Sequence, residues 1–66
     1  MDYRSSIRFV SNLRTRQQIN HFAELYNIDL TGLNSNPAMI AKIKEVLKWR
    51  NENNIDLKDD GTKQHN

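Results

Sequence analysis

The segment from Thr15 to Tyr26 constrains the fold most, because its start and its apolar spacing both indicate one α-helix. Thr15 followed by Gln18 is a capping-box pattern, in which each side chain bonds the backbone N–H of the other residue. Apolar side chains then recur at helical spacing at Ile19, Phe22, Ala23 and Tyr26. The pattern predicts an amphipathic helix that buries this stripe and leaves its polar face in water.

The predicted helix ends at Asn27, since Asn readily takes the left-handed conformation that terminates helices, and Ile28 is placed to fold back on Ala23. The order Asn-Ile-Asp-Leu at residues 27–30 recurs at residues 54–57. A second helix is predicted between the two copies, with Asn36 as its cap and Pro37 at its first position, running to about residue 52. Both copies therefore follow a helix, and the repetition predicts one stop signal used twice.

Residues 6–11 read Ser-Ile-Arg-Phe-Val-Ser and favour a short strand, because they alternate and contain β-branched and aromatic residues. Ile7 and Phe9 would form its apolar face, and Ser6, Arg8 and Val10 its outer face. A short helix over residues 5–13 is the alternative, because Phe9, Val10 and Leu13 also stand at helical spacing.

These elements predict a mainly α fold with one domain over residues 1–53, in which a short N-terminal strand precedes two helices. The alternative fold is an all-α helix, extended loop and helix, with residues 28–36 as an apolar-anchored loop. Residues 54–66 are predicted to be a polar, disordered tail.

The small size of the chain predicts a homodimer. A domain of fewer than about 70–80 residues needs disulfides, a metal or a partner to stabilise its core. This chain has 66 residues, 36% of them apolar, and no cysteine. His21 and His65 lie far apart without cysteine neighbours, so no structural metal is expected. No apolar run is long enough for a membrane span or a signal peptide, and the absence of cysteine suits a cytoplasmic protein.

Signatures of catalysis are lacking, which predicts a protein that is not an enzyme and takes no cofactor or small-molecule substrate. The sequence has no glycine-rich phosphate loop, and no Ser or Thr stands near a plausible histidine base. The acids of residues 56–61 do not make a calcium loop, because Lys58 occupies a ligand position.

Charge is distributed in blocks that suit a polyanionic partner. Residues 1–16 carry a net charge of +3 and residues 37–50 another +3, whereas residues 17–36 and 51–66 each carry −2. If the fold brings the two basic blocks to one side, the resulting surface would attract nucleic acid.

The order of strand and two helices resembles the ribbon-helix-helix family of small DNA-binding repressors. Ile7 and Phe9 match the core positions of its strand, and the helices match through the following apolar residues: Ile19, Phe22, Ala23, Tyr26, Met39, Ile40, Ile43 and Leu47. The resemblance covers about residues 6–50. It implies a transcriptional regulator that acts as an intertwined homodimer and inserts a two-stranded ribbon into the major groove of double-stranded DNA.

The same resemblance implies two sets of DNA contacts. Base contacts would come from Ser6, Arg8 and Val10, of which Arg8 could donate twice to a guanine edge. Phosphate contacts would come from Arg4, Arg14, Arg16, Ser35, Asn36, Lys44 and Lys48, with the start of the second helix presenting backbone donors.

A second resemblance, to helix–extended-loop–helix modules of the SAP type, is carried by the two helices and by residues 27–33 between them, Asn-Ile-Asp-Leu-Thr-Gly-Leu. It implies DNA binding through the sugar–phosphate backbone more than through the bases. The alternative function is a small helical adaptor or inhibitor that binds another protein through Trp49, Tyr26 and the loop.

Overall fold

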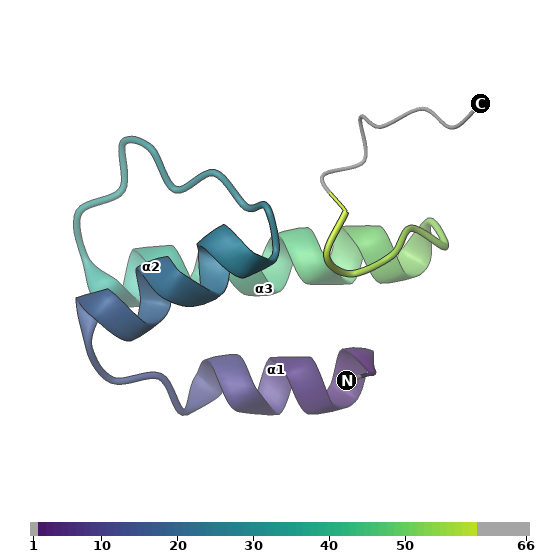
Figure 1. Ribbon diagram of the computed structural model, residues 1–66, viewed down its shortest axis with the longest axis horizontal. Helices are drawn as coiled ribbons and strands as arrows, with labels where there is room; N and C mark the ends of the chain where they lie inside the picture. The colour runs from purple at the N-terminus through teal and green to yellow at the C-terminus, as the bar shows by residue number, and fades with distance from the viewer. Residues whose placement is uncertain (1, 60–66) are drawn as a thin grey trace.

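Residues 2–59 are described by the computed structural model, and within them the chain forms three helices and no strand. The helices are α1 (Tyr3–Ser11), α2 (Arg16–Leu25) and α3 (Asn36–Glu52). Figure 1 shows that α1 and α2 both lie along α3, the longest helix. The predicted mainly α class is confirmed. None of the helices in this range is long and apolar enough to cross a membrane.

The predicted N-terminal strand is wrong, because residues 3–11 form α1. Asp2 caps this helix, since its carboxylate accepts a hydrogen bond from the backbone N–H of Ser5 at 2.8 Å. The same bond holds the pKa of the exposed Asp2 carboxyl below its usual range. Ser6 and Val10, four residues apart, are completely buried. A helix satisfies its own backbone hydrogen bonds, whereas a lone strand would have needed a second strand to pair with.

The prediction for α2 is confirmed at its start and on its buried face. The Thr15 hydroxyl accepts from the Gln18 N–H at 3.1 Å, and the Gln18 side chain accepts from the Thr15 N–H at 3.2 Å, which completes the capping box. The predicted stripe of Ile19, Phe22, Ala23 and Tyr26 is buried. The start of α3 differs from the prediction by one residue, because Ser35 is the cap and accepts from the Ala38 N–H at 3.2 Å.

The repeated Asn-Ile-Asp-Leu sequence ends α2 and α3 in the same way, as predicted. Asn27 and Asn54 have φ values of 53° and 59°, in the left-handed region. The N–H of Ile28 bonds the carbonyl of residue 23 at 2.8 Å, and the N–H of Ile55 bonds that of residue 50 at 2.8 Å. Each copy therefore closes its helix with the same six-to-one bond of a Schellman motif.

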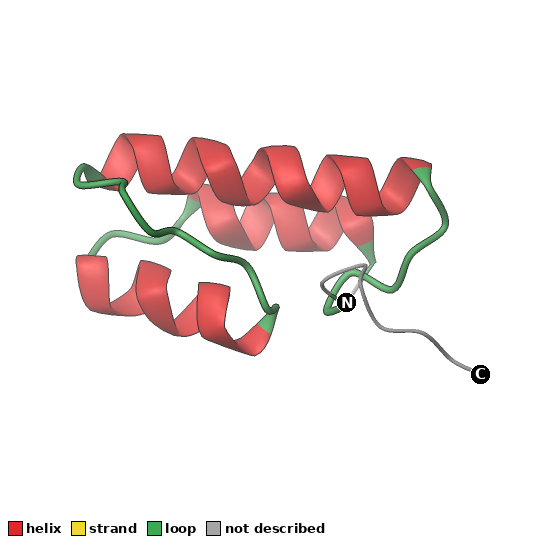
Figure 2. Ribbon diagram, turned by 90° about the horizontal axis from the view of Figure 1, so that it is seen from above, coloured by secondary structure: helices red, strands yellow, loops and turns green. Residues whose placement is uncertain are grey.

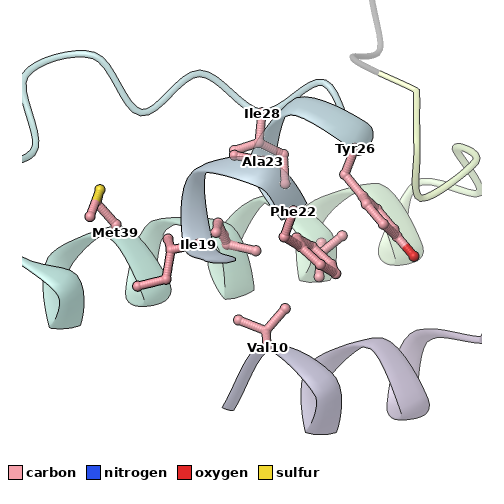
Figure 3. Packing of buried hydrophobic residues seen from close by; sticks show 9 residues of the cluster. Val10, Ile19, Phe22, Ala23, Tyr26, Ile28 and Met39 are labelled. Carbon is pink, nitrogen blue, oxygen red and sulfur yellow. The ribbon is translucent and has the colours of Figure 1, made fainter. Parts of the chain in front are cut away.

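The core lies where α1 and α2 meet α3 (Figure 3). Its buried apolar residues are Val10, Ile19, Phe22, Ala23, Tyr26, Ile28, Met39, Ile43 and Leu47. The rings of Phe22 and Tyr26 stack with their centroids 4.1 Å apart, and Phe9 stacks on Phe22 at 5.8 Å. Ile28 carries the connection between α2 and α3 into this core, so residues 26–35 are anchored rather than free.

Arg50 is a charged residue inside this structure, with 2% of its surface exposed. Its guanidinium donates to the carbonyl oxygens of Tyr26 at 2.5 Å, Asn27 at 2.8 Å and Leu57 at 2.8 Å. Two of these carbonyls lie at the end of α2, where the helix dipole is negative, and the third lies after α3. Arg50 therefore joins the end of α2 to the segment that follows α3.

The contacts of the domain continue beyond its predicted limit at residue 53. Leu57 packs against the core, and the Asn27 side-chain amide donates to the Lys58 carbonyl at 2.8 Å. The Lys58 ammonium lies 5.4 Å from the centre of the Tyr26 ring, within the range of a cation–π interaction. Residues 54–59 are thus held against the helices, while the rest of the predicted tail, residues 60–66, lies outside the described residues.

Replacing Ser6 with alanine is expected to raise the free energy of unfolding by about 1 kcal/mol. The Ser6 hydroxyl is buried without a hydrogen-bond partner among residues 2–59, and alanine is the better helix former. Urea denaturation followed by far-UV circular dichroism measures the change. Ser11→Ala, on the exposed side of the same helix, serves as the control. A loss of stability in Ser6→Ala would mean that the hydroxyl has a partner in solution.

Candidate nucleic-acid interface

The end of the molecule where α2 and α3 begin combines two helix N-termini with two arginines. Figures 1 and 2 show α2 and α3 starting at the same end, on the left in both views, while α1 runs in the opposite direction. Arg14 and Arg16 flank the cap of α2, and residues 34–36 lead into α3. We call this set, residues 14–16 and 34–36, the basic end.

Two hydrogen bonds hold the two halves of the basic end together. The Arg16 guanidinium donates to the carbonyl oxygen of Asn34, and the Asn36 side-chain amide donates to that of Arg14 at 3.5 Å. The Gln18 side chain also accepts from the Arg14 N–H at 2.8 Å, which fixes the backbone that enters α2. The arginines are thereby placed beside the start of α3, although 18 residues separate Arg16 from Asn34.

The electrostatics of the basic end favour an anion. The capping bonds use the N–H groups of residues 15 and 18, so those of Arg16 and Gln17 have no partner among residues 2–59. The dipoles of both helices place partial positive charge at the same end. No Asp or Glu occurs from residue 3 to 23 or from residue 30 to 44, the two stretches that contribute the basic end. Arg14 and Arg16 are exposed, and one N–H of the Arg16 guanidinium is used internally.

The set predicted to contact bases does not form one surface. Ser6 and Val10 are completely buried, whereas Arg8 is exposed in the last turn of α1. In a strand, residues 6, 8 and 10 would share a face, but in a helix residues 6 and 10 share a face and residue 8 turns away from it. The prediction of a two-stranded ribbon that enters the major groove is therefore wrong.

The set predicted to contact phosphates divides into two groups. Four members lie together at the basic end: Arg14, Arg16, Ser35 and Asn36. Three lie elsewhere: Arg4 is exposed on the first turn of α1, Lys44 is half-buried on α3, and Lys48 is exposed on α3. Arg50, which contributed to the second basic block, is buried and unavailable to a polyanion.

Two residues that hold the basic end in place lay outside the predicted sites. Asn34 supplies the carbonyl that holds Arg16, and Gln18 supplies the oxygen that holds the Arg14 backbone. The capping-box pattern contains Gln18 and was the available signal for it. No local signal identifies Asn34, because its role depends on how α3 lies beside α2.

Of the residues proposed for binding another protein, the structure buries Tyr26 and places Trp49 beside the loop. Tyr26 is 5% exposed and stacks within the core, so it cannot serve as a contact. Trp49 is 51% exposed and lines a shallow hollow with Leu33, Lys42 and Val46, beside the loop between α2 and α3.

The fold and the basic end together define a small helical module in which an extended connection, residues 26–35, brings two helix starts to one end. Comparison with models of protein families, with curated proteins and with solved structures finds no match to this chain.

Proposed function

We propose that the protein binds double-stranded DNA through its sugar–phosphate backbone, with the basic end as the contact surface. The observation that carries the proposal is the placement of Arg14 and Arg16 beside the starts of both α2 and α3, held there by the bonds to Asn34 and Asn36. The helix–extended-loop–helix arrangement supports it, because the SAP-type resemblance implies binding of this kind. The major-groove ribbon is not part of the proposal.

The basic end would hold phosphates by two physical effects. Arginine has a planar set of N–H donors that suits a phosphate, and the arginine side chains carry full positive charge. Backbone N–H groups at a helix start add donors along the dipole, which favours an anion at short range. Neither effect distinguishes one base from another, so the proposed binding is independent of sequence.

Titration of labelled DNA duplexes at several salt concentrations tests the proposal. Each neutralised phosphate contributes about 0.9 to the slope of log affinity against log salt, so the two arginines predict a slope of about −2. Duplexes of unrelated sequence are expected to bind with the same affinity. Absence of binding at low salt, or an affinity that does not change with salt, would overturn the proposal. A strong preference for one sequence would contradict binding through the backbone alone.

A further inference from the structure

The segment that follows α3, residues 54–59, turns back against the ends of α2 and α3, and we call it the C-terminal strap (Figure 1). Two side chains outside the strap bond its backbone. The Arg50 guanidinium, on α3, donates to the Leu57 carbonyl at 2.8 Å. The Asn27 side-chain amide, from the turn that ends α2, donates to the Lys58 carbonyl at 2.8 Å. The strap is therefore docked on the helices through two successive carbonyl groups.

Apolar packing holds the strap more weakly than it holds the three helices together. Among residues 2–59, none of the buried apolar residues of the core belongs to the strap. Its own apolar residues, Ile55 and Leu57, are only half-buried. A hollow of about 520 Å³ lies between the strap and the start of α1. Segments with few buried apolar contacts open locally at a lower free energy than the core does, so the strap is the part of this fold that opens most readily.

The repeated Asn-Ile-Asp-Leu sequence provides an internal comparison for the strap. Ile28 and Ile55 each follow a left-handed Asn, and the N–H of each donates at 2.8 Å to the carbonyl five residues earlier. Ile28 is 7% exposed and belongs to the core, whereas Ile55 is half-buried. The same local sequence is thus anchored after α2 and lightly held after α3. The difference lies in tertiary packing, because the local bonds are the same.

We propose that the C-terminal strap detaches as a unit while the three helices stay folded, and that its release uncovers the Tyr26 ring. In the docked state Tyr26 is 5% exposed, with Phe22 stacked on it and the Lys58 ammonium 5.4 Å from its centre. Release removes Lys58 but leaves the Arg50 guanidinium bonded to the carbonyls of Tyr26 and Asn27. The end of α2 therefore stays in place, and the strap controls access to Tyr26 at the end of the molecule opposite to the basic end.

Amide hydrogen exchange of the full chain at increasing urea concentrations, followed by NMR, tests the proposal. The Ile55 N–H is expected to exchange at least about tenfold faster than the Ile28 N–H, its matched control. Its rate is expected to stay constant below the unfolding transition, because release of the strap exposes little surface. The N–H of Ile43, buried in α3, needs global unfolding, so its rate rises with urea. Equal rates for Ile28 and Ile55, or the same urea dependence for Ile55 and Ile43, would overturn the proposal.

A core variant separates release of the strap from loss of folding. Ile19 is completely buried on α2, and Ile19→Val removes one methylene group from the core. The change is expected to raise the exchange rate of the Ile43 N–H about fivefold and to leave that of the Ile55 N–H unchanged, because the strap opens without the core. An equal rise at both positions would show that the strap opens only when the whole chain unfolds, which would overturn the proposal.

A variant within the strap tests whether release uncovers Tyr26. Leu57→Ala removes most of an apolar side chain that packs against the core, so the exchange rate of the Ile55 N–H is expected to rise about tenfold. Nitration of the Tyr26 ring by tetranitromethane is expected to become faster by the same factor. An unchanged rate of either process would overturn the proposal. None of these measurements involves DNA, so the strap and the proposed function can fail separately.

Discussion

Replacing Arg50 with methionine is expected to lower the free energy of unfolding by about 3–5 kcal/mol. The side chain keeps its approximate length, but the carbonyl oxygens of Tyr26, Asn27 and Leu57 lose their shared donor. The bond to the Tyr26 carbonyl is buried and the other two are partly buried, so water cannot fully replace the guanidinium. A domain of this size has a total stability of roughly 3–10 kcal/mol, so the variant is expected to be largely unfolded or close to it.

Lys48→Met is the matched control for Arg50, because it removes the same charge from the same helix at an exposed position. It is expected to change stability by no more than about 0.5 kcal/mol. Arg50→Lys tests the geometry, since an ammonium keeps the charge but lacks the planar fork that reaches three carbonyls. The free energy of unfolding of Arg50→Lys is expected to lie between those of Arg50→Met and Lys48→Met. Urea denaturation followed by circular dichroism gives the order of stability of the three variants. Equal stability of Arg50→Met and Lys48→Met would contradict the role assigned to Arg50.

Arg14→Glu is expected to weaken binding to duplex DNA by about 30–100-fold at low salt and to reduce the salt slope by about 1. The change removes one phosphate contact and places a negative charge between the starts of two helices. Arg14 is the cleaner position for this test, because its backbone holds the hydrogen bonds at the basic end while its side chain is exposed. Arg16 is better changed to lysine, since its guanidinium also bonds the Asn34 carbonyl.

Arg8→Glu is the control for Arg14→Glu, because it changes the net charge equally at an exposed position on α1. The lost positive charge is expected to weaken the binding of Arg8→Glu to duplex DNA only a few-fold. The slope of log affinity against log salt is expected to stay the same within measurement error. Fluorescence anisotropy with one duplex at four salt concentrations measures both variants. If Arg8→Glu has the larger effect, the contact surface lies on α1 and not at the basic end. If both have the same effect, no localised contact exists.

A strand was predicted in place of α1 because the apolar pattern in this segment is short, and because the packing that decides its structure involves residues far along the chain. Ile7 and Phe9 alternate as a strand would, and Val10 and Leu13 offered only a brief helical repeat. Asp2 is the local signal that favours a helix, since it caps the first turn. The surface of α3 then selects the helix, because Ser6 and Val10 are buried together while Arg8 between them is exposed, and only helical spacing turns residue 8 away from the face that residues 6 and 10 share.

Arg50 shows why a count of charges does not define a surface. Its position next to Trp49 gives no sign of burial, and it appears in the sequence as one more cation of a basic block. Its partners are carbonyls 24, 23 and 7 residues away in the chain. The three carbonyl oxygens come together around one guanidinium only because both Asn-Ile-Asp-Leu segments end their helices there.

The sequence by itself determined where α2 starts, and where α2 and α3 end, because caps and left-handed Asn residues act through bonds within five positions of the chain. The tertiary structure decided which residues meet across the fold. Arg14 and Arg16 lie beside residues 34–36 only because α2 and α3 start at the same end, and Phe9 lies beside Phe22 only because α1 and α2 share α3 as a support. Such contacts depend on how apolar faces pack together, and local hydrogen bonding does not specify that packing.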